Sequence, residues 1–191
     1  MDLKEAKAAV KPYLTTKRYE HTLRVADTAA ELSDRFHASK NKAQFAAVFH
    51  DYAKYRSVNE MKRWILQSPE LPKDLLYYHP ELWHGPVGSI LVEREHGIKD
   101  REIQSAVRYH TTGKAHMSDL ELIVFVADYI EPGRDFPGLD KIREMAEHDL
   151  VKTAWMVSSN TIAYLLKKGN PIYPDTFYAY NDLTKRINGG N

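Results

Sequence analysis

Five ionisable side chains occupy positions that apolar residues normally take in an amphipathic helix. His50, for example, follows Ala43, Ala46 and Ala47 at spacings of seven, four and three residues, which puts all four on one helix face. His21, His110 and Asp128 have apolar neighbours at the same helical spacing, and Asp51 is adjacent to His50. The sequence therefore predicts that imidazoles and carboxylates from several segments face the interior.

An inward-facing histidine or aspartate also has an ordinary explanation. A core histidine commonly bonds a backbone carbonyl, and a buried aspartate can cap a helix or pair with arginine. Two buried carboxylates on separate segments, however, need compensating charge, which neutral imidazoles do not supply and a divalent cation does. Nitrogen and oxygen ligands without sulfur favour iron, manganese, cobalt, nickel or zinc over calcium.

The elements that position these residues belong to a chain of ordinary globular composition. The chain has 191 residues, a usual size for one domain, of which 43% are hydrophobic and 28% charged. With 27 Lys and Arg against 26 Asp and Glu, its net charge is +1, so no large positive field can hold a long nucleic acid. The absence of cysteine excludes disulfides, thiolate ligands and a cysteine nucleophile, and fits a reducing compartment.

The hydropathy pattern does not indicate a membrane partner. The longest apolar stretch, residues 120–130, contains Glu121 and Asp128 and is far shorter than the about 20 residues that span a bilayer. The amino terminus, MDLKEAKAAVKPYL, lacks the apolar core of a secretion signal. We therefore expect a cytoplasmic protein.

The apolar spacing is helical throughout, and no segment alternates as a strand. We expect a first helix that stops near Pro12, a second from Thr16 to Phe36, and a third that is capped by Asn41 and continues through residues 43–55. Later helices are expected to start at Ser57, Gly85 with Pro86, Asp100 and Ser118, and the stretch 150–169 ends in a capping glycine. The predicted fold class is all-α, a helical bundle of about eight to ten helices.

Five ordered motifs surround the inward-facing residues: RYEHTLRVA at 18–26, HDYAK at 50–54, HGPVGS at 84–89, YHTTG at 109–113 and ADYIEPGRDFPGLDKIR at 127–143. His21, the pair His50 and Asp51, and the distant Asp128 match the H…HD…D signature of HD-domain metal-dependent phosphohydrolases. With the surrounding motifs, residues 18–180 resemble the YqeK family of bacterial HD-domain hydrolases, with Ser89 where we expect alanine. The GYP motif of the cyclic-dinucleotide phosphodiesterase branch is absent.

This resemblance implies a single HD domain over residues 1–191, with the motifs in 18–143 and further helices in 144–191. The implied activity is hydrolysis of an acid anhydride, in which diadenosine tetraphosphate is cut symmetrically into two ADP molecules. Two divalent metal ions are implied, with iron expected and manganese, cobalt, nickel or zinc as alternatives. Two such ions can acidify a shared water, whose hydroxide attacks phosphorus.

The resemblance also assigns the ligands. His21, His50, Asp51 and Asp128 would hold the first ion, and His84 and His110 the second, with Asp51 as the bridging catalytic residue. His79 competes with His84 and is disfavoured only because it lies outside the matching motif. The remaining histidines are expected to be surface or terminal residues and not ligands: His37, His96, His116 and His148.

Four cationic side chains near these ligands are candidates for binding a polyphosphate. Lys54 lies three residues past Asp51 on the same predicted helix face and is also a catalytic candidate. Arg134 follows Asp128 across a proline-glycine break, and Arg18 and Arg24 flank His21. The alternatives are an exposed lysine and plain salt bridges.

Two other functions remain open at this point. A nucleotidase or phosphatase for a smaller nucleotide would use the same ligands, and a non-catalytic nucleotide sensor would keep a structural metal site. The complete ligand set argues against the sensor. The aromatic cluster Tyr173, Phe177, Tyr178 and Tyr180 fits core or dimer contacts, so a homodimer stays open and the adenine contacts are unassigned.

Overall fold

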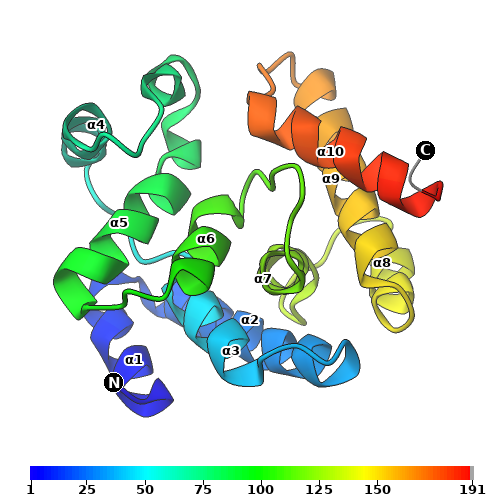
Figure 1. The fold of residues 1–191 in the computed structure, drawn as a ribbon, viewed down its shortest axis with the longest axis horizontal. Helices are drawn as coiled ribbons and strands as arrows, with labels where there is room; N and C mark the ends of the chain where they lie inside the picture. The colour runs from blue at the N-terminus through cyan, green and yellow to red at the C-terminus, as the bar shows by residue number, and fades with distance from the viewer. Residues whose placement is uncertain (190–191) are drawn as a thin grey trace.

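Helices account for the regular structure of residues 1–189, the part of the chain that the computed structural model describes (Figure 1). The α-helices are α1 Leu3–Val10, α2 Thr16–Arg35, α3 Lys40–Phe49, α4 Val58–Gln67, α5 His84–His96, α6 Arg101–Tyr109, α7 Asp119–Ile130, α8 Leu139–Ala146, α9 Leu150–Lys167 and α10 Pro174–Ile187. Three short 3-10 helices also occur: η1 Lys11–Tyr13, η2 Lys73–Tyr77 and η3 Pro80–Leu82. Ten α-helices and no strand in this range confirm the all-α prediction.

Side chains at the helix ends set where several elements begin and stop. The Ser118 hydroxyl accepts from the Glu121 N–H at 3.3 Å, and the Glu121 carboxylate accepts from the Ser118 N–H at 2.8 Å, a complete capping box. Asp100 caps α6, and Gly169 follows α9 with a φ of 65°. These three predictions are confirmed.

The third predicted helix was placed wrongly at both ends. Ser39, not Asn41, is the N-cap, because its hydroxyl accepts from the Lys42 N–H. The helix also ends at Phe49 instead of continuing to residue 55. The His50 ring bonds the Ala47 carbonyl at 2.6 Å, and this is the carbonyl that the next N–H of a continuing helix would need. Residues 50–56 therefore form successive turns.

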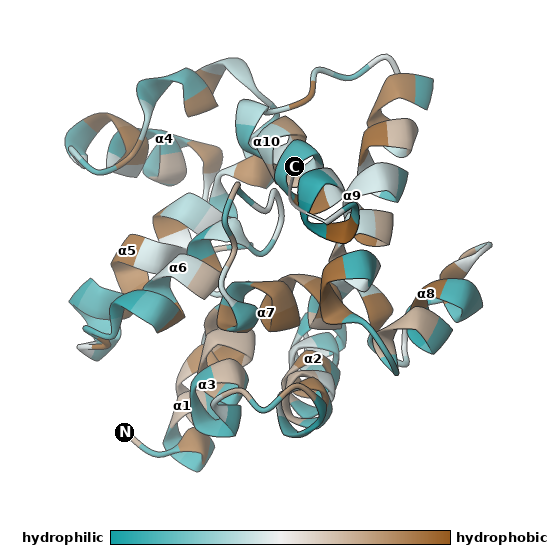
Figure 2. Ribbon diagram, turned by 45° about the vertical axis from the view of Figure 1, so that its right-hand side comes forward, coloured by the Kyte–Doolittle hydropathy of each residue, from teal (hydrophilic) through white to brown (hydrophobic). Residues whose placement is uncertain are grey.

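The apolar helix α7 forms the centre of the bundle. Its residues 120–127 are all buried, and it packs against α2, α3, α6, α8 and α9. Figure 2 shows α7 as a largely hydrophobic ribbon in the middle of the molecule. A continuous cluster of buried apolar side chains extends from Ala6 of α1 to Leu183 of α10. Asp128, near the end of α7, is thus carried into the bundle by its most apolar helix.

The aromatic cluster near the carboxyl end divides into packed and exposed members. Tyr173 is buried edge-on against Tyr78, with ring centroids 4.9 Å apart, and Tyr180 stacks on Trp155. Phe177 and Tyr178 are exposed. The homodimer stays a prediction.

Within residues 1–189, no helix combines the length and apolar character needed to cross a membrane.

The start of α5 lies directly against the backbone of α6. A Cβ added at Gly85 would be 2.8 Å from the Arg108 carbonyl oxygen, whereas one at Gly88 would have its nearest neighbour, Val107 Cγ1, at 3.6 Å. Only Gly85 is therefore required for the two helices to approach this closely.

Gly85→Ala should lower the free energy of unfolding by about 1–3 kcal/mol, because the added methyl group separates α5 from α6. Gly88→Ala, on the same helix, is the control and should leave stability unchanged or raise it by up to about 1 kcal/mol. Urea unfolding followed by circular dichroism measures both. Equal effects of the two substitutions would contradict the close approach.

Candidate metal centre

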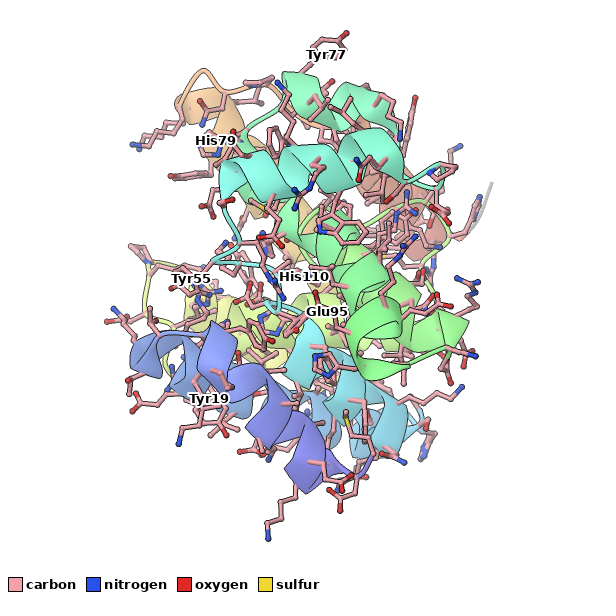
Figure 3. The ribbon with its side chains drawn as sticks, turned by 90° about the vertical axis from the view of Figure 1, so that its left-hand side faces the viewer. Tyr19, Tyr55, Tyr77, His79, Glu95 and His110 are labelled. Carbon is pink, nitrogen blue, oxygen red and sulfur yellow. The ribbon has the colours of Figure 1, made fainter. Side chains whose placement is uncertain are left out.

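Six histidine and aspartate side chains from separate parts of the chain meet inside the bundle. They are His21 of α2, His50 and Asp51 after the end of α3, His84 at the start of α5, His110 after α6 and Asp128 in the last turn of α7. Five are buried, and the Asp128 side chain is 21% exposed. Figure 3 places His110 in the interior, among the helix ends that surround it. The structure thus brings together every residue proposed as a ligand from the sequence.

The Asp51 carboxylate lies between two pairs of imidazole rings. Its Oδ2 is 3.1 Å from His50 Nε2 and 3.8 Å from His21 Nε2. Its Oδ1 is 3.1 Å from His84 Nε2 and 3.9 Å from His110 Nε2. Each oxygen faces a different pair, which is the arrangement that a carboxylate shared by two neighbouring cations needs.

Asp128 joins one of these two sides. Its Oδ1 is 3.0 Å from His21 Nε2 and 3.7 Å from His50 Nε2. Three overlapping groups of ligand atoms result, each with its members within 4.8 Å of one another: His21, His50 and Asp51; His50, His110 and Asp128; Asp51, His84 and His110.

Three of the rings are oriented by the same kind of local hydrogen bond. The Nδ1 atoms of His50, His84 and His110 lie 2.6, 2.6 and 2.7 Å from the carbonyl oxygens of Ala47, Glu81 and Val107, each three residues earlier. Because a carbonyl can only accept, Nδ1 carries a hydrogen, and a neutral ring then presents a lone pair at Nε2. The inward-facing nitrogen of each ring is therefore the one suited to a metal.

The electrostatics of the cluster call for a positive charge. Burial, together with the neighbouring His84 and His50, lowers the pKa of His110 to about 3, so this ring is neutral at pH 7. Burial alone would raise the pKa of Asp51, but the adjacent His50 and His84 rings lower it well below its usual range. Asp51 in turn raises the pKa of His50 against the opposing effect of burial.

Two buried nitrogens at this centre lack a hydrogen-bond partner. Nε2 of His21 and Nε2 of His50 make no hydrogen bond to any described residue, although carboxylate oxygens lie near both. Lone pairs and ionised carboxylates that converge in this way fit divalent cations. Four imidazole nitrogens and two carboxylates, without sulfur, suit iron, manganese, cobalt, nickel or zinc.

The segment that contains all six side chains is similar in sequence to a known protein family. The family described as HD domain matches residues 18–133. This chain belongs to the HD-domain family.

Relatives of this HD domain extend the similarity to nearly the whole chain. This chain is 50% identical over 183 residues to the symmetrical bis(5'-nucleosyl)-tetraphosphatase of Bacillus subtilis (strain 168). The match covers 96% of this chain and 98% of that protein. This chain is 41% identical over 189 residues to the Staphylococcus aureus (strain NCTC 8325 / PS 47) protein of the same name, covering 95% and 97%.

A crystal structure from Clostridium acetobutylicum, described as a predicted HD superfamily hydrolase involved in NAD metabolism, has a similar fold. The two chains superpose with a TM-score of 0.92 at 35% sequence identity, and the match covers 97% of this chain and 98% of the other. The predicted resemblance to the YqeK family of HD-domain hydrolases is confirmed.

Three of the four predicted phosphate-binding cations border the centre of this HD domain. Arg18 donates to Asp51 Oδ2 at 3.0 Å, and Arg134 donates to Asp128 Oδ1 at 2.9 Å. Arg24 donates to Glu131 Oε2 at 2.5 Å. All three line a cavity of about 430 Å³ that opens beside His21.

Lys54 does not share a helix face with Asp51, because α3 has already ended. Its N–H donates to the Asp51 carbonyl at 2.9 Å in the following turn. Its Nζ donates to Glu81 Oε2 at 2.6 Å, and this hydrogen bond lowers the pKa of Glu81. Because the Glu81 carbonyl accepts from His84, Lys54 is held on the His84 side of the centre rather than among the arginines.

Glu131 is a residue of the centre that the sequence analysis missed. It is 1% exposed, its Oε1 accepts from His21 Nδ1 at 2.9 Å, and its Oε2 accepts from Arg24 and from the Gly133 N–H. Burial alone would raise the pKa of Glu131, but hydrogen bonds from Arg24, His21 and Gly133 lower it. Glu131 thus orients His21 as the backbone carbonyls orient the other rings. The available signal was its place in the motif ADYIEPG, three residues after Asp128.

The remaining histidines lie outside the centre. His79, the competitor of His84, is exposed, and its Nδ1 accepts from the Glu81 N–H. His37, His116 and His148 are exposed, as expected. His96 is the last residue of α5 and is half-buried, because its ring packs on Phe49 and Tyr52.

Glu131→Gln should lower the affinity for divalent metal by about 10- to 100-fold, because a neutral amide orients His21 less firmly than a carboxylate. Metal analysis after dialysis measures the loss, and excess metal should restore turnover. Glu144→Gln, at an exposed position of α8, is the control. Equal metal content in the two variants would contradict a positioning role.

Proposed function

We propose that this chain is a metal-dependent phosphohydrolase that cleaves diadenosine tetraphosphate symmetrically into two ADP molecules. The observation that carries the proposal is the Asp51 carboxylate, whose two oxygens face different pairs of inward Nε2 atoms. The names of the relatives in Bacillus subtilis and Staphylococcus aureus supply the substrate class.

In symmetrical cleavage the bond that breaks is at the centre of the substrate. Oxygen from water forms a bond to one of the two inner phosphorus atoms, and the bond from that phosphorus to the central bridging oxygen breaks. The bridging oxygen leaves on the other half, so each half is released as ADP. Two divalent cations, when bound, lower the pKa of a water and offset charge on the attacking and leaving oxygens.

The side chains of this chain divide between holding the cations and holding the phosphates. His21, His50, Asp51 and Asp128 would form one ligand set, and His84 and His110, with Asp51, the other. Arg18 and Arg134 stand beside the carboxylates of Asp51 and Asp128, where their planar guanidinium groups can also reach phosphate oxygens. Lys54 supplies a cation on the His84 side.

We propose iron as the metal, because the resemblance to the YqeK family implies it. Manganese, cobalt, nickel and zinc are the alternatives, because a donor set of imidazoles and carboxylates without sulfur suits all five metals. Elemental analysis of freshly purified protein distinguishes among them. The cytoplasmic location, the homodimer and the division into residues 18–143 and 144–191 stay predictions.

Metal-replete protein should convert each diadenosine tetraphosphate into two equivalents of ADP, measured by anion-exchange chromatography. Asp51→Ala should abolish turnover and lower metal content, because it removes the two carboxylate oxygens that face the two pairs of histidine rings. ATP and AMP in equal amounts would contradict symmetrical cleavage. Phosphate release from mononucleotides alone would support the nucleotidase, and binding without turnover the sensor.

Lys54→Met should lower kcat/KM by about 30- to 1,000-fold, or roughly 2–4 kcal/mol, because a cation beside the reacting phosphates is lost. Metal content should not change. Lys62→Met, at an exposed position of α4, is the matched control. An unchanged kcat/KM would show that Lys54 serves only its ion pair with Glu81.

A further inference from the structure

The cavity beside His21 has the charge that a phosphate chain requires. Its lining includes four cationic side chains, Lys17, Arg18, Arg24 and Arg134, against the carboxylates of Glu131 and Asp135. Arg18 and Arg134 are paired with Asp51 and Asp128 of the centre, so their guanidinium groups become available to phosphates when the proposed cations bind the same carboxylates.

An exposed aromatic ring stands in the same cavity. Tyr55 is 53% exposed, and among the exposed large apolar side chains of residues 1–189 it is the one that lines this cavity. Its hydroxyl lies 3.3 Å from Thr15 Oγ1, and hydrogen bonds from Thr15 and Arg18 lower the pKa of Tyr55. The ring is thus held in place, and Figure 3 shows Tyr55 toward the outside of the molecule, level with His110.

The loop after α7 also lines the cavity that contains Tyr55. Glu131 anchors this loop by accepting from the Gly133 N–H at 2.6 Å while it also holds Arg24. A Cβ at Gly133 would overlap the Arg24 guanidinium, so a larger residue there would have to displace the Arg24 side chain from Glu131. Three residues after Gly133 the loop supplies Phe136 to the lining, and this ring is fixed edge-on to Tyr129, with the ring centroids 5.1 Å apart.

Asp51, Arg18 and Tyr55 follow one another in the order in which a nucleoside diphosphate carries its terminal phosphate, its next phosphate and its base. Asp51 belongs to the centre, Arg18 bonds Asp51, and Tyr55 lies beyond Arg18 next to Thr15. A nucleoside diphosphate whose terminal phosphate reaches the centre would have its next phosphate beside a guanidinium and its base beside an aromatic ring.

We propose that this cavity is the subsite for one ADP half of the dinucleotide and that the base stacks on the Tyr55 ring. The proposal rests on the proposed function, because it names the part of that substrate that the cavity holds. Stacking of a base on an aromatic side chain is tolerant of the base and contributes measurably to binding.

The test compares two probes, ADP and inorganic pyrophosphate, by titration calorimetry on metal-loaded protein. Tyr55→Leu should weaken ADP binding by about 5- to 100-fold and leave pyrophosphate binding unchanged, because only ADP has a base to stack. The KM for diadenosine tetraphosphate should rise by a similar factor. Tyr55→Phe keeps the ring and should retain most of the ADP affinity.

The matched control is Tyr77→Leu, because Tyr77 is 86% exposed on η2 and does not line the cavity. Unchanged ADP affinity in Tyr55→Leu would overturn the subsite. An equal loss for ADP and pyrophosphate would also overturn it, because the effect would then come from displacing Arg18. ADP binding that depends on Tyr55 without cleavage of the dinucleotide would support the subsite and reject the proposed function.

Discussion

The structure depends on how two ionised carboxylates are accommodated inside an apolar bundle. Asp51 and Asp128 lie against imidazoles whose outer nitrogens are already occupied, and each carboxylate also accepts from one arginine, Arg18 or Arg134. Even with one guanidinium beside each carboxylate, burying this many ionisable groups together is costly, and it would be an unusual way to fill a core. The same cost makes the cluster informative, because packing alone does not require it.

The residues that could be found from the sequence are those whose helical spacing conflicts with their polarity. His50, His110 and Asp128 interrupt apolar stripes, and this conflict locates them without any knowledge of the fold. Glu131 could not be found in this way, because it follows the last residue of α7 and its partners lie more than a hundred residues earlier. Lys54 was misplaced because α3 ends at Phe49, where the His50 ring bonds the Ala47 carbonyl, and the apolar spacing gave no sign of this end.

The cations near the centre are arranged by carboxylates rather than by the overall charge of the chain. Arg18, Arg24 and Arg134 are each held by an acid of the centre or by Glu131, so the positive groups gather at one cavity of a chain with a net charge of +1. Because Glu131 holds His21, Arg24 and the loop at Gly133 together, one buried carboxylate fixes both a candidate ligand and the lining of the cavity.

The bonds from His50, His84 and His110 to carbonyls three residues earlier have a consequence for how such a chain can vary in length. A residue inserted in the segments that join these helices leaves each three-residue interval intact. A residue inserted within one of the intervals would turn that ring away and also release a backbone carbonyl that it now satisfies. A change of length between the short stretches that carry the rings therefore preserves the local orientation of each ring, whereas a change inside one of them does not.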